Sequence, residues 1–149
     1  MEVSEIITPE RTYIGLEGSS KKRVLEQAAE FIAQQSPELD PNELFDNLII
    51  REKLGSTAIG KGVAIPHCRI THCNKVQGAL IRLNQAVDFD AIDNEPVDLL
   101  FVLLVPENST EEHLQALSQI ASRFNNDRLT SSLRSAEGNQ SLYDCFIAS

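Results

Sequence analysis

The chain has 149 residues, of which 42% are apolar and 23% are charged, and its formal net charge is −9 at pH 7. This balance excludes intrinsic disorder, and a chain of this length can bury about two-thirds of its unfolded surface in one core, so residues 1–149 are expected to form a single domain. The negative charge, the absence of Trp and an aromatic content of 5% argue against a nucleic-acid surface. An acidic surface instead suits a basic protein partner.

No segment of the sequence predicts membrane insertion or secretion. The longest apolar runs, residues 48–50 and 99–105, are far shorter than the roughly 20 residues that span a bilayer. The N-terminal residues lack the basic and apolar regions of a secretory signal. The three cysteines, an odd number without regular spacing, favour free thiols in a reducing compartment. A cytoplasmic protein is therefore expected.

The first part of the chain predicts a strand followed by two helices. Residues 12–17 alternate and contain β-branched and aromatic side chains, which is typical of a short strand. Apolar residues then recur at helical spacing over 24–32 and indicate an amphipathic helix. A second helix is expected over residues 40–54, because Asp40 is a typical N-cap and Glu43 can complete a capping box.

Residues 55–62 predict a flexible connecting loop. Three glycines interrupt this segment, and a short apolar run follows at residues 63–65. Pro66 fixes its own backbone angle and lacks an N–H group, so we expect a strand that ends at this proline and projects His67 from its tip.

The second half of the chain predicts two strands and three helices. Residues 76–83 alternate, whereas residues 97–105 are almost continuously apolar, as in a strand at the centre of a sheet. Ser109 and Glu112 form a capping-box pattern at the start of a helix whose apolar stripe reaches Phe124. Two shorter helices are expected over residues 128–136 and 140–147. The interleaved order predicts an α/β fold, with a mixed central β-sheet flanked by helices on both faces.

The segment 55–62 partly matches a nucleotide-binding P-loop, because two glycines five residues apart precede a lysine. In a P-loop a Ser or Thr follows that lysine and binds magnesium, whereas Gly62 follows Lys61 here. A P-loop also leaves a strand and enters a helix, and the expected order here is the reverse. A connecting loop is therefore favoured over a nucleotide site.

Residues 67–73 contain four side chains that can bind zinc: His67, Cys68, His72 and Cys73. In an extended segment, at about 3.3 Å per residue, Cys68 and His72 would lie about 13 Å apart. Zinc requires its ligands at about 2.0–2.3 Å from one point, so only a curled loop could chelate it. No metal site is expected, and His72 is predicted to be an exposed loop residue.

The segment REKLGSTAIGKGVAIPH, residues 51–67, contains the most specific pattern of the chain. Its glycine-spaced turn, short apolar strand and Ala-Ile-Pro-His together resemble the active-site signature of the mannitol/fructose-type enzyme IIA proteins of the bacterial phosphotransferase system. The resemblance extends through residues 89–94 and 96–100 to the helix that carries His113. The chain is similar to the nitrogen-regulatory members of that family. The resemblance implies one type-2 enzyme IIA domain over residues 1–149.

This resemblance implies that His67 accepts a phosphoryl group and that His113 is the second active-site histidine. At neutral pH an imidazole usually has one unprotonated, nucleophilic nitrogen. Arg51 offers donors suited to phosphoryl oxygens, and the hydroxyls of Ser56 and Thr57 could assist it without a cofactor. From spacing alone, His113 is more typical of a core histidine, Arg51 of a helix C-terminus, and the two hydroxyl residues of a turn.

Cys68 departs from the family pattern, which often has Gly beside the acceptor histidine. The substitution adds a thiol next to His67, and the sequence leaves its reactivity open.

The resemblance also implies a donor and targets. The donor would be the histidine phosphocarrier protein of the nitrogen-related phosphotransferase chain, and the targets would be regulatory proteins such as potassium-transport regulators. Because the sequence ends at Ser149 after a helical tail, regulatory output is favoured over sugar uptake. The alternatives are a sugar-specific enzyme IIA that serves a separate mannitol- or fructose-type permease and an interaction module that no longer transfers phosphate.

Overall fold

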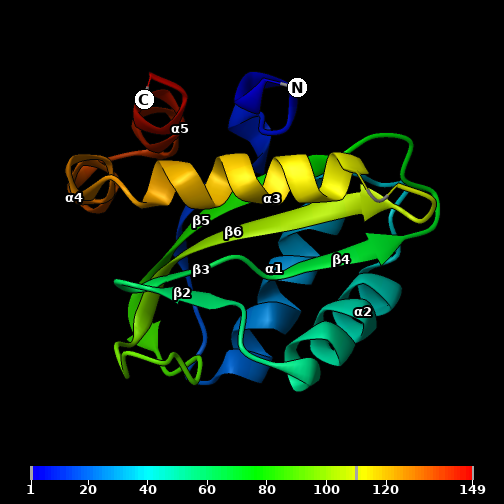
Figure 1. Cartoon of the computed structure of the whole chain (residues 1–149), viewed down its shortest axis with the longest axis horizontal. Coiled ribbons are helices and arrows are strands. Elements are labelled where there is room, and N and C mark those ends of the chain that lie inside the picture. Colours follow the sequence, from blue (N-terminus) through cyan, green and yellow to red (C-terminus); the bar gives the residue numbers. More distant parts are fainter. Residues whose placement is uncertain (1, 110, 149) are drawn as a thin grey trace.

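A mixed β-sheet forms the centre of the computed structural model, which describes residues 2–109 and 111–148 apart from the side chain of Glu112 (Figure 1). The sheet has the strand order β1-β5-β6-β3-β2, and β4 pairs with β6 beyond the end of β3. In chain order the strands are β1 (Thr12–Leu16), β2 (Ala58–Gly60), β3 (Val63–Ala64), β4 (His67–Ile70), β5 (Gln77–Val87) and β6 (Val97–Pro106).

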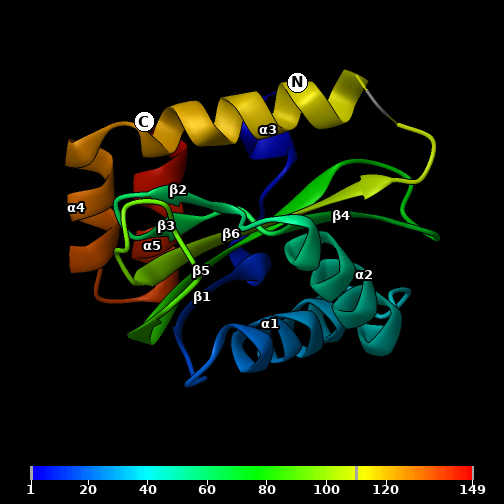
Figure 2. The same cartoon turned by 60° about the horizontal axis from the view of Figure 1, so that its bottom comes forward.

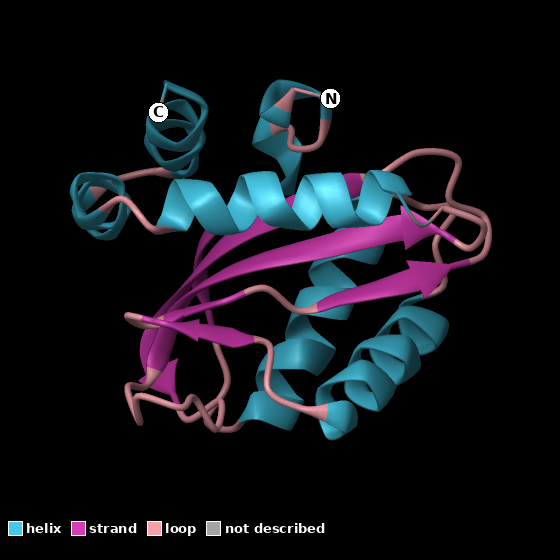
Figure 3. Ribbon diagram, in the orientation of Figure 1, coloured by secondary structure: helices cyan, strands magenta, loops and turns pink. Residues whose placement is uncertain are grey.

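Helices cover both faces of this sheet, as Figures 2 and 3 show. One face is covered by α1 (Lys21–Gln35) and α2 (Pro41–Leu54). The other face is covered by α3 (Glu111–Phe124), α4 (Asp127–Ser135) and α5 (Asn139–Ala148), together with the 3₁₀ turn Val3–Glu5. A second 3₁₀ turn, Pro9–Arg11, leads into β1. The predicted α/β class and the placement of helices on both faces are confirmed.

Strand β6 separates two apolar cores. It pairs antiparallel with β5 on one side and parallel with β3 and β4 on the other. Because side chains alternate along a strand, Leu100 and Val102 pack with α1 and α2, whereas Phe101 and Leu103 pack with α3 to α5. The central position predicted for this apolar run is confirmed.

The helix boundaries follow from local capping. The side chain of Ser20 accepts a hydrogen bond from the Arg23 N–H at the start of α1, and Asp40 accepts one from the Asn42 N–H at the start of α2. The predicted capping box at Ser109 and Glu112 lies outside the described residues, because it requires the side chain of Glu112. Among the helices described, none is both long and apolar enough to cross a membrane.

The structure corrects the prediction for residues 55–66. The expected flexible loop contains β2, which pairs antiparallel with β3. The predicted strand does end before Pro66, since β3 stops at Ala64, but His67 does not project from its tip. A further strand, β4, begins at His67 beside the same neighbour, β6. Pro66 cannot donate to the ladder, but its carbonyl accepts a 2.9 Å hydrogen bond from the Leu103 N–H, so the chain stays aligned with β6.

Candidate functional site

The two histidines selected from the sequence lie against each other. His67 is the first residue of β4, and His113 lies in the first turn of α3. Their rings meet edge to face, with centroids 5.3 Å apart and an interplanar angle of 66°. His67 is 9% exposed, and His113 is half-buried. The two histidines are 46 positions apart in the sequence, from 67 to 113, and the fold brings them together from a strand and a helix.

The hydrogen bonds of His67 define which ring nitrogen carries the proton. Its Nδ1 lies 2.6 Å from the carbonyl oxygen of Ile65, which can only accept, so Nδ1 is protonated and donates. Its Nε2 accepts a 3.3 Å hydrogen bond from the Nε of Arg51. The break in the strand at residues 65–66 lets the Ile65 carbonyl face the ring that follows it. The nucleophilic lone pair of the neutral ring is consequently on Nε2.

The surroundings of both histidines favour the neutral imidazole. Burial lowers the pKa of His67 below its usual value; the nearby Arg51 charge adds to this effect, and the hydrogen bond to Ile65 only partly opposes it. Burial also lowers the pKa of His113, and His67, Arg69 and Arg51 contribute in the same direction. At neutral pH both rings are therefore uncharged.

These lowered pKa values predict a loss of stability in mild acid. At pH values between the lowered pKa of each histidine in the folded protein and its unfolded value of about 6.5, the unfolded chain binds more protons than the folded protein does. Stability should therefore fall as the pH decreases below about 6.5, and this contribution should be constant above it. Urea unfolding of the wild type and of the double variant His67→Gln/His113→Gln, at pH 7.5 and 5.5, measures the effect. The double variant should lose less stability between the two pH values. The exposed His72→Gln variant is the control and should match the wild type; equal losses in all three proteins would refute the prediction.

Arg51 lies at the end of α2, where it reaches the site and the following turn. Its Nη1 donates a 2.9 Å hydrogen bond to the Gly55 carbonyl, while its Nε contacts His67. The structure thus places Arg51 against His67. Its expected role toward a phosphoryl group stays a prediction.

A buried carboxylate, Glu52, fixes the turn that follows α2. It is 6% exposed and accepts hydrogen bonds from the Thr57 N–H at 2.9 Å and the Thr57 hydroxyl at 2.6 Å. The ammonium group of Lys21 forms an ion pair with it at 3.1 Å. Sequence analysis missed this residue. The available signal was its spacing, because Glu52 continues the buried stripe of Leu44 and Leu48 at intervals of four residues.

The hydroxyls of Ser56 and Thr57 have partners other than His67. The hydroxyl of Ser56 donates to the Phe89 carbonyl and accepts a 3.1 Å hydrogen bond from the Ala58 N–H, whereas that of Thr57 donates to Glu52. Both therefore stabilise the conformation of the loop between α2 and β2. Their expected role in binding the phosphoryl group stays a prediction.

Cys68 follows His67, and its thiol is expected to be unreactive in the native protein. Its side chain is buried at 7% exposure, and this burial raises the pKa of the thiol to about 12. At pH 8 its alkylation in the native protein should be at least about 10³-fold slower than that of an exposed thiol with a pKa of about 8.5. Iodoacetamide labelling followed by peptide mass mapping measures this rate, and the guanidinium-unfolded protein is the positive control. Rapid labelling of native Cys68 would contradict the assignment.

The zinc alternative gains no support from the geometry. His72 is exposed in the turn after β4, away from the buried His67. Within residues 2–109 and 111–148, no group of three or more His, Cys, Asp or Glu side chains is placed to hold a metal ion.

Exposed apolar side chains lie close in sequence to the site residues. Ile50 and Leu54 of α2 are 60% and 81% exposed, and Leu114, which follows His113, is 68% exposed. Exposed apolar side chains are common on surfaces that dock another protein.

The fold that holds the histidine pair is that of the enzyme IIA proteins of the phosphotransferase system. The family model described as phosphoenolpyruvate-dependent sugar phosphotransferase system, EIIA 2 matches residues 5–149. The chain belongs to this family, which confirms the resemblance seen in the sequence.

Several relatives of the chain within this family carry a regulatory name. A nitrogen regulatory protein of Pseudomonas aeruginosa is 49% identical over 147 residues, which cover 99% of this chain and 96% of that protein. The structure of nitrogen regulatory protein IIA-Ntr from Neisseria meningitidis aligns with a TM-score of 0.87 at 40% identity and covers 95% of this chain and 97% of that one. The mannitol IIA of Escherichia coli shares the fold, with a TM-score of 0.76 at 17% identity over 93% of this chain and 97% of its own.

Proposed function

We propose that Nε2 of His67 accepts a phosphoryl group from a phosphohistidine of the histidine phosphocarrier protein in the nitrogen-related phosphotransferase chain. In this step the bond from phosphorus to the donor imidazole breaks while the bond to Nε2 forms. Each ring keeps the proton on its other nitrogen, so the donor leaves as a neutral imidazole. The reaction needs no cofactor, and it is reversible because the two bonds are of the same kind.

The observation that carries this proposal is the arrangement of polar atoms around Nε2 of His67. The ring is neutral and oriented by the Ile65 carbonyl, and the Arg51 guanidinium lies at the atom that would be phosphorylated. Nε2 of His113 is buried and has no hydrogen-bond partner among the described residues. Buried polar atoms without partners are rare, and an oxygen of an incoming phosphoryl group would supply the missing partner.

Positioning and charge would then provide the catalysis. Phosphoryl transfer needs little covalent assistance from the protein beyond in-line placement and stabilisation of the oxygens. His67 lies at the start of a strand within the sheet, so its backbone position is well defined. Arg51 would balance charge on the transferred group, and a neutral His113 can donate one hydrogen bond to it.

The surface around the site supports a protein as the donor. The exposed side chains of Ile50, Leu54 and Leu114 provide apolar contact area, and the net charge of −9 favours a basic partner. Phosphorylation would add about −1.5 to −2 charges at this surface and so could permit or block the docking of a target.

The output of this switch is proposed to be regulation in the cytoplasm, with targets such as potassium-transport regulators. The 49% identity to a nitrogen regulatory protein supports this reading over a sugar-specific carrier, because the mannitol IIA shares only 17% identity. Retention of both histidines and Arg51 supports a transferring protein over an inactive interaction module.

The test is incubation of the purified protein with the phosphorylated phosphocarrier, followed by intact mass measurement. A gain of about 80 Da that is lost in acid and maps to His67 is expected. Without such a gain the transfer function is wrong. The regulatory output is tested by comparing the affinity of the phosphorylated and unphosphorylated forms for a candidate target. Equal affinities for every target tried, combined with phosphoryl transfer to a mannitol- or fructose-type permease, would favour the sugar-specific alternative.

A further inference from the structure

A cavity of about 690 Å³ lies between α1 and α2, and neither histidine of the site lines it. One wall is apolar and consists of Phe45 and Ile49 of α2. The other side is formed by Ser20, Lys21 and Lys22 at the start of α1. Lys53, Glu52 and Asp90 complete the lining. Cavities of about 300–1,000 Å³ are typical of small-molecule sites in proteins.

The positive charges of this cavity are only partly neutralised. Lys21 forms ion pairs with Glu52 at 3.1 Å and with Asp90 at 2.9 Å. Lys22 and Lys53 are exposed, and neither forms an ion pair with any carboxylate in the part of the chain that the structure describes. Two uncompensated ammonium groups at one cavity are notable in a chain of net charge −9. The N–H groups in the first turn of the 15-residue helix α1 add positive potential on the same side.

The combination of an apolar wall and two unpaired lysines specifies the ligand chemistry. We propose that this cavity binds a small organic phosphate, with its phosphate facing Lys22 and Lys53 and its apolar body against Phe45 and Ile49. An inorganic anion would leave the apolar wall in contact with water, and a neutral apolar ligand would leave the lysines without a partner. A phosphate monoester with a planar or aliphatic body satisfies both sides.

The cavity is connected to the acceptor site through Glu52. This carboxylate lines the cavity, pairs with Lys21 and also accepts two hydrogen bonds from Thr57, in the loop between α2 and β2. Arg51, which contacts His67, is its neighbour on α2. An anion bound beside Lys21 would weaken the attraction between Lys21 and Glu52. It would so alter the hydrogen bonds that Glu52 accepts from Thr57. The inference that a bound ligand would change the rate of phosphoryl transfer rests on the proposed function. The inference that the ligand binds in this cavity does not.

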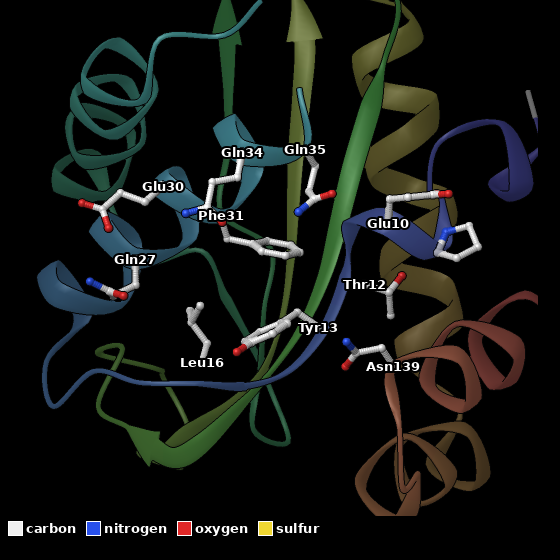
Figure 4. A pocket seen from close by; sticks show the side chains of 11 residues that line it. Glu10, Thr12, Tyr13, Leu16, Gln27, Glu30, Phe31, Gln34, Gln35 and Asn139 are labelled. Carbon is white, nitrogen blue, oxygen red and sulfur yellow. The ribbon is translucent and has the colours of Figure 1, made fainter. Parts of the chain in front are cut away.

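A second cavity serves as an internal control. It has a volume of about 440 Å³ and lies where α1 approaches β1, and its lining includes the rings of Tyr13 and Phe31, whose centroids are 5.1 Å apart (Figure 4). Its rim contains Glu10 and Glu30 together with amide side chains, and none of the residues that line it is basic. Phosphate esters should therefore avoid this cavity.

The experiment is an NMR titration of the ¹⁵N-labelled protein in 150 mM salt with phenyl phosphate, inorganic phosphate and phenol. Phenyl phosphate should shift the amide signals of Lys22 and Ile49 saturably, with a dissociation constant at least 10-fold lower than that of either fragment. The Thr57 amide should shift along the same binding curve, whereas the amides of Tyr13 and Phe31 should not. The variant Lys22→Gln/Lys53→Gln should weaken binding at least 10-fold. Lys75→Gln, at an exposed lysine before β5, is the matched control and should bind as the wild type does.

Two outcomes would overturn the cavity proposal without affecting the proposed function. One is equal, non-saturating shifts with phenyl phosphate and inorganic phosphate, which indicate general charge attraction. The other is shifts centred on Arg51 and His67 that the double lysine variant does not change, which place the anion at the histidine pair. Conversely, saturable binding in the cavity by a protein that accepts no phosphoryl group would leave the cavity proposal intact and refute only the proposed function.

Discussion

Replacing His67 by alanine should abolish phosphoryl acceptance, with a rate at least about 10⁴-fold below that of the wild type. The variant loses the only atom to which the geometry assigns the new bond, Nε2 of the neutral ring. Replacing His113 by alanine should leave acceptance possible but slow it by about 10²–10³-fold, the usual effect of removing one preorganised donor from a charged transition state. The difference in size between the two effects separates the acceptor from its assisting histidine.

The measurement is a time course with the phosphorylated phosphocarrier, quenched in alkali and followed by intact mass. His72→Ala is the matched control, because His72 is exposed in the turn after β4, and its rate should equal that of the wild type. An acid-labile gain of mass in His67→Ala at the wild-type rate would show that another residue is the acceptor. An equally complete loss in His113→Ala, with the fold preserved, would contradict the assisting role assigned to His113.

Replacing Glu52 by alanine should destabilise the protein by about 3 kcal/mol, at the lower end of the range for breaking a buried ion pair. The change leaves the Thr57 N–H and hydroxyl without their acceptor and removes one of the two carboxylates bound to Lys21. Lys21 is itself only 18% exposed, so its charge is poorly compensated by water. It keeps Asp90 as a partner, which is why the lower end of the range is expected.

Urea unfolding monitored by circular dichroism gives the change in free energy of unfolding. Glu30→Ala, at an exposed glutamate of α1, is the control and should change stability by less than about 0.5 kcal/mol. The loss of stability in Glu52→Gln should lie between the losses in Glu52→Ala and Glu30→Ala, because the amide keeps one acceptor for Thr57 but lacks the negative charge. A loss below about 1 kcal/mol in Glu52→Ala would mean that this network contributes little to the fold.

Features with local causes could be predicted from the sequence. Helix α2 begins where Asp40 and Pro41 place it, because capping involves only neighbouring residues. The run that forms β6 was recognised as central, since a strand that is covered on both faces must be apolar throughout. The motif that ends in His67 identified the acceptor candidate, and the structure brings His113 and Arg51 to it.

Features that depend on distant contacts could not be predicted. Strand β2 is short and half-exposed, and only its pairing with β3 reveals it. The strand resumes after Pro66 because the neighbouring β6 provides a continuous partner, which no local pattern contains. The position of His113 on an apolar helix stripe was compatible with a core residue, and only the packing of α3 shows its ring facing His67. Glu52 was missed because its partners lie in α1 and in the following loop.

The contact between the Ile65 carbonyl and Nδ1 of His67 also bears on how long a transferred group would stay. With phosphorus on one nitrogen and a proton on the other, the imidazole becomes a cation, and the carbonyl dipole stabilises that cation. A cationic ring is a good leaving group, so its nitrogen–phosphorus linkage remains easy to cleave. The interruption of the strand at Pro66, which turns the Ile65 carbonyl toward this ring, would thereby keep the phosphoryl group easy to transfer to the next protein.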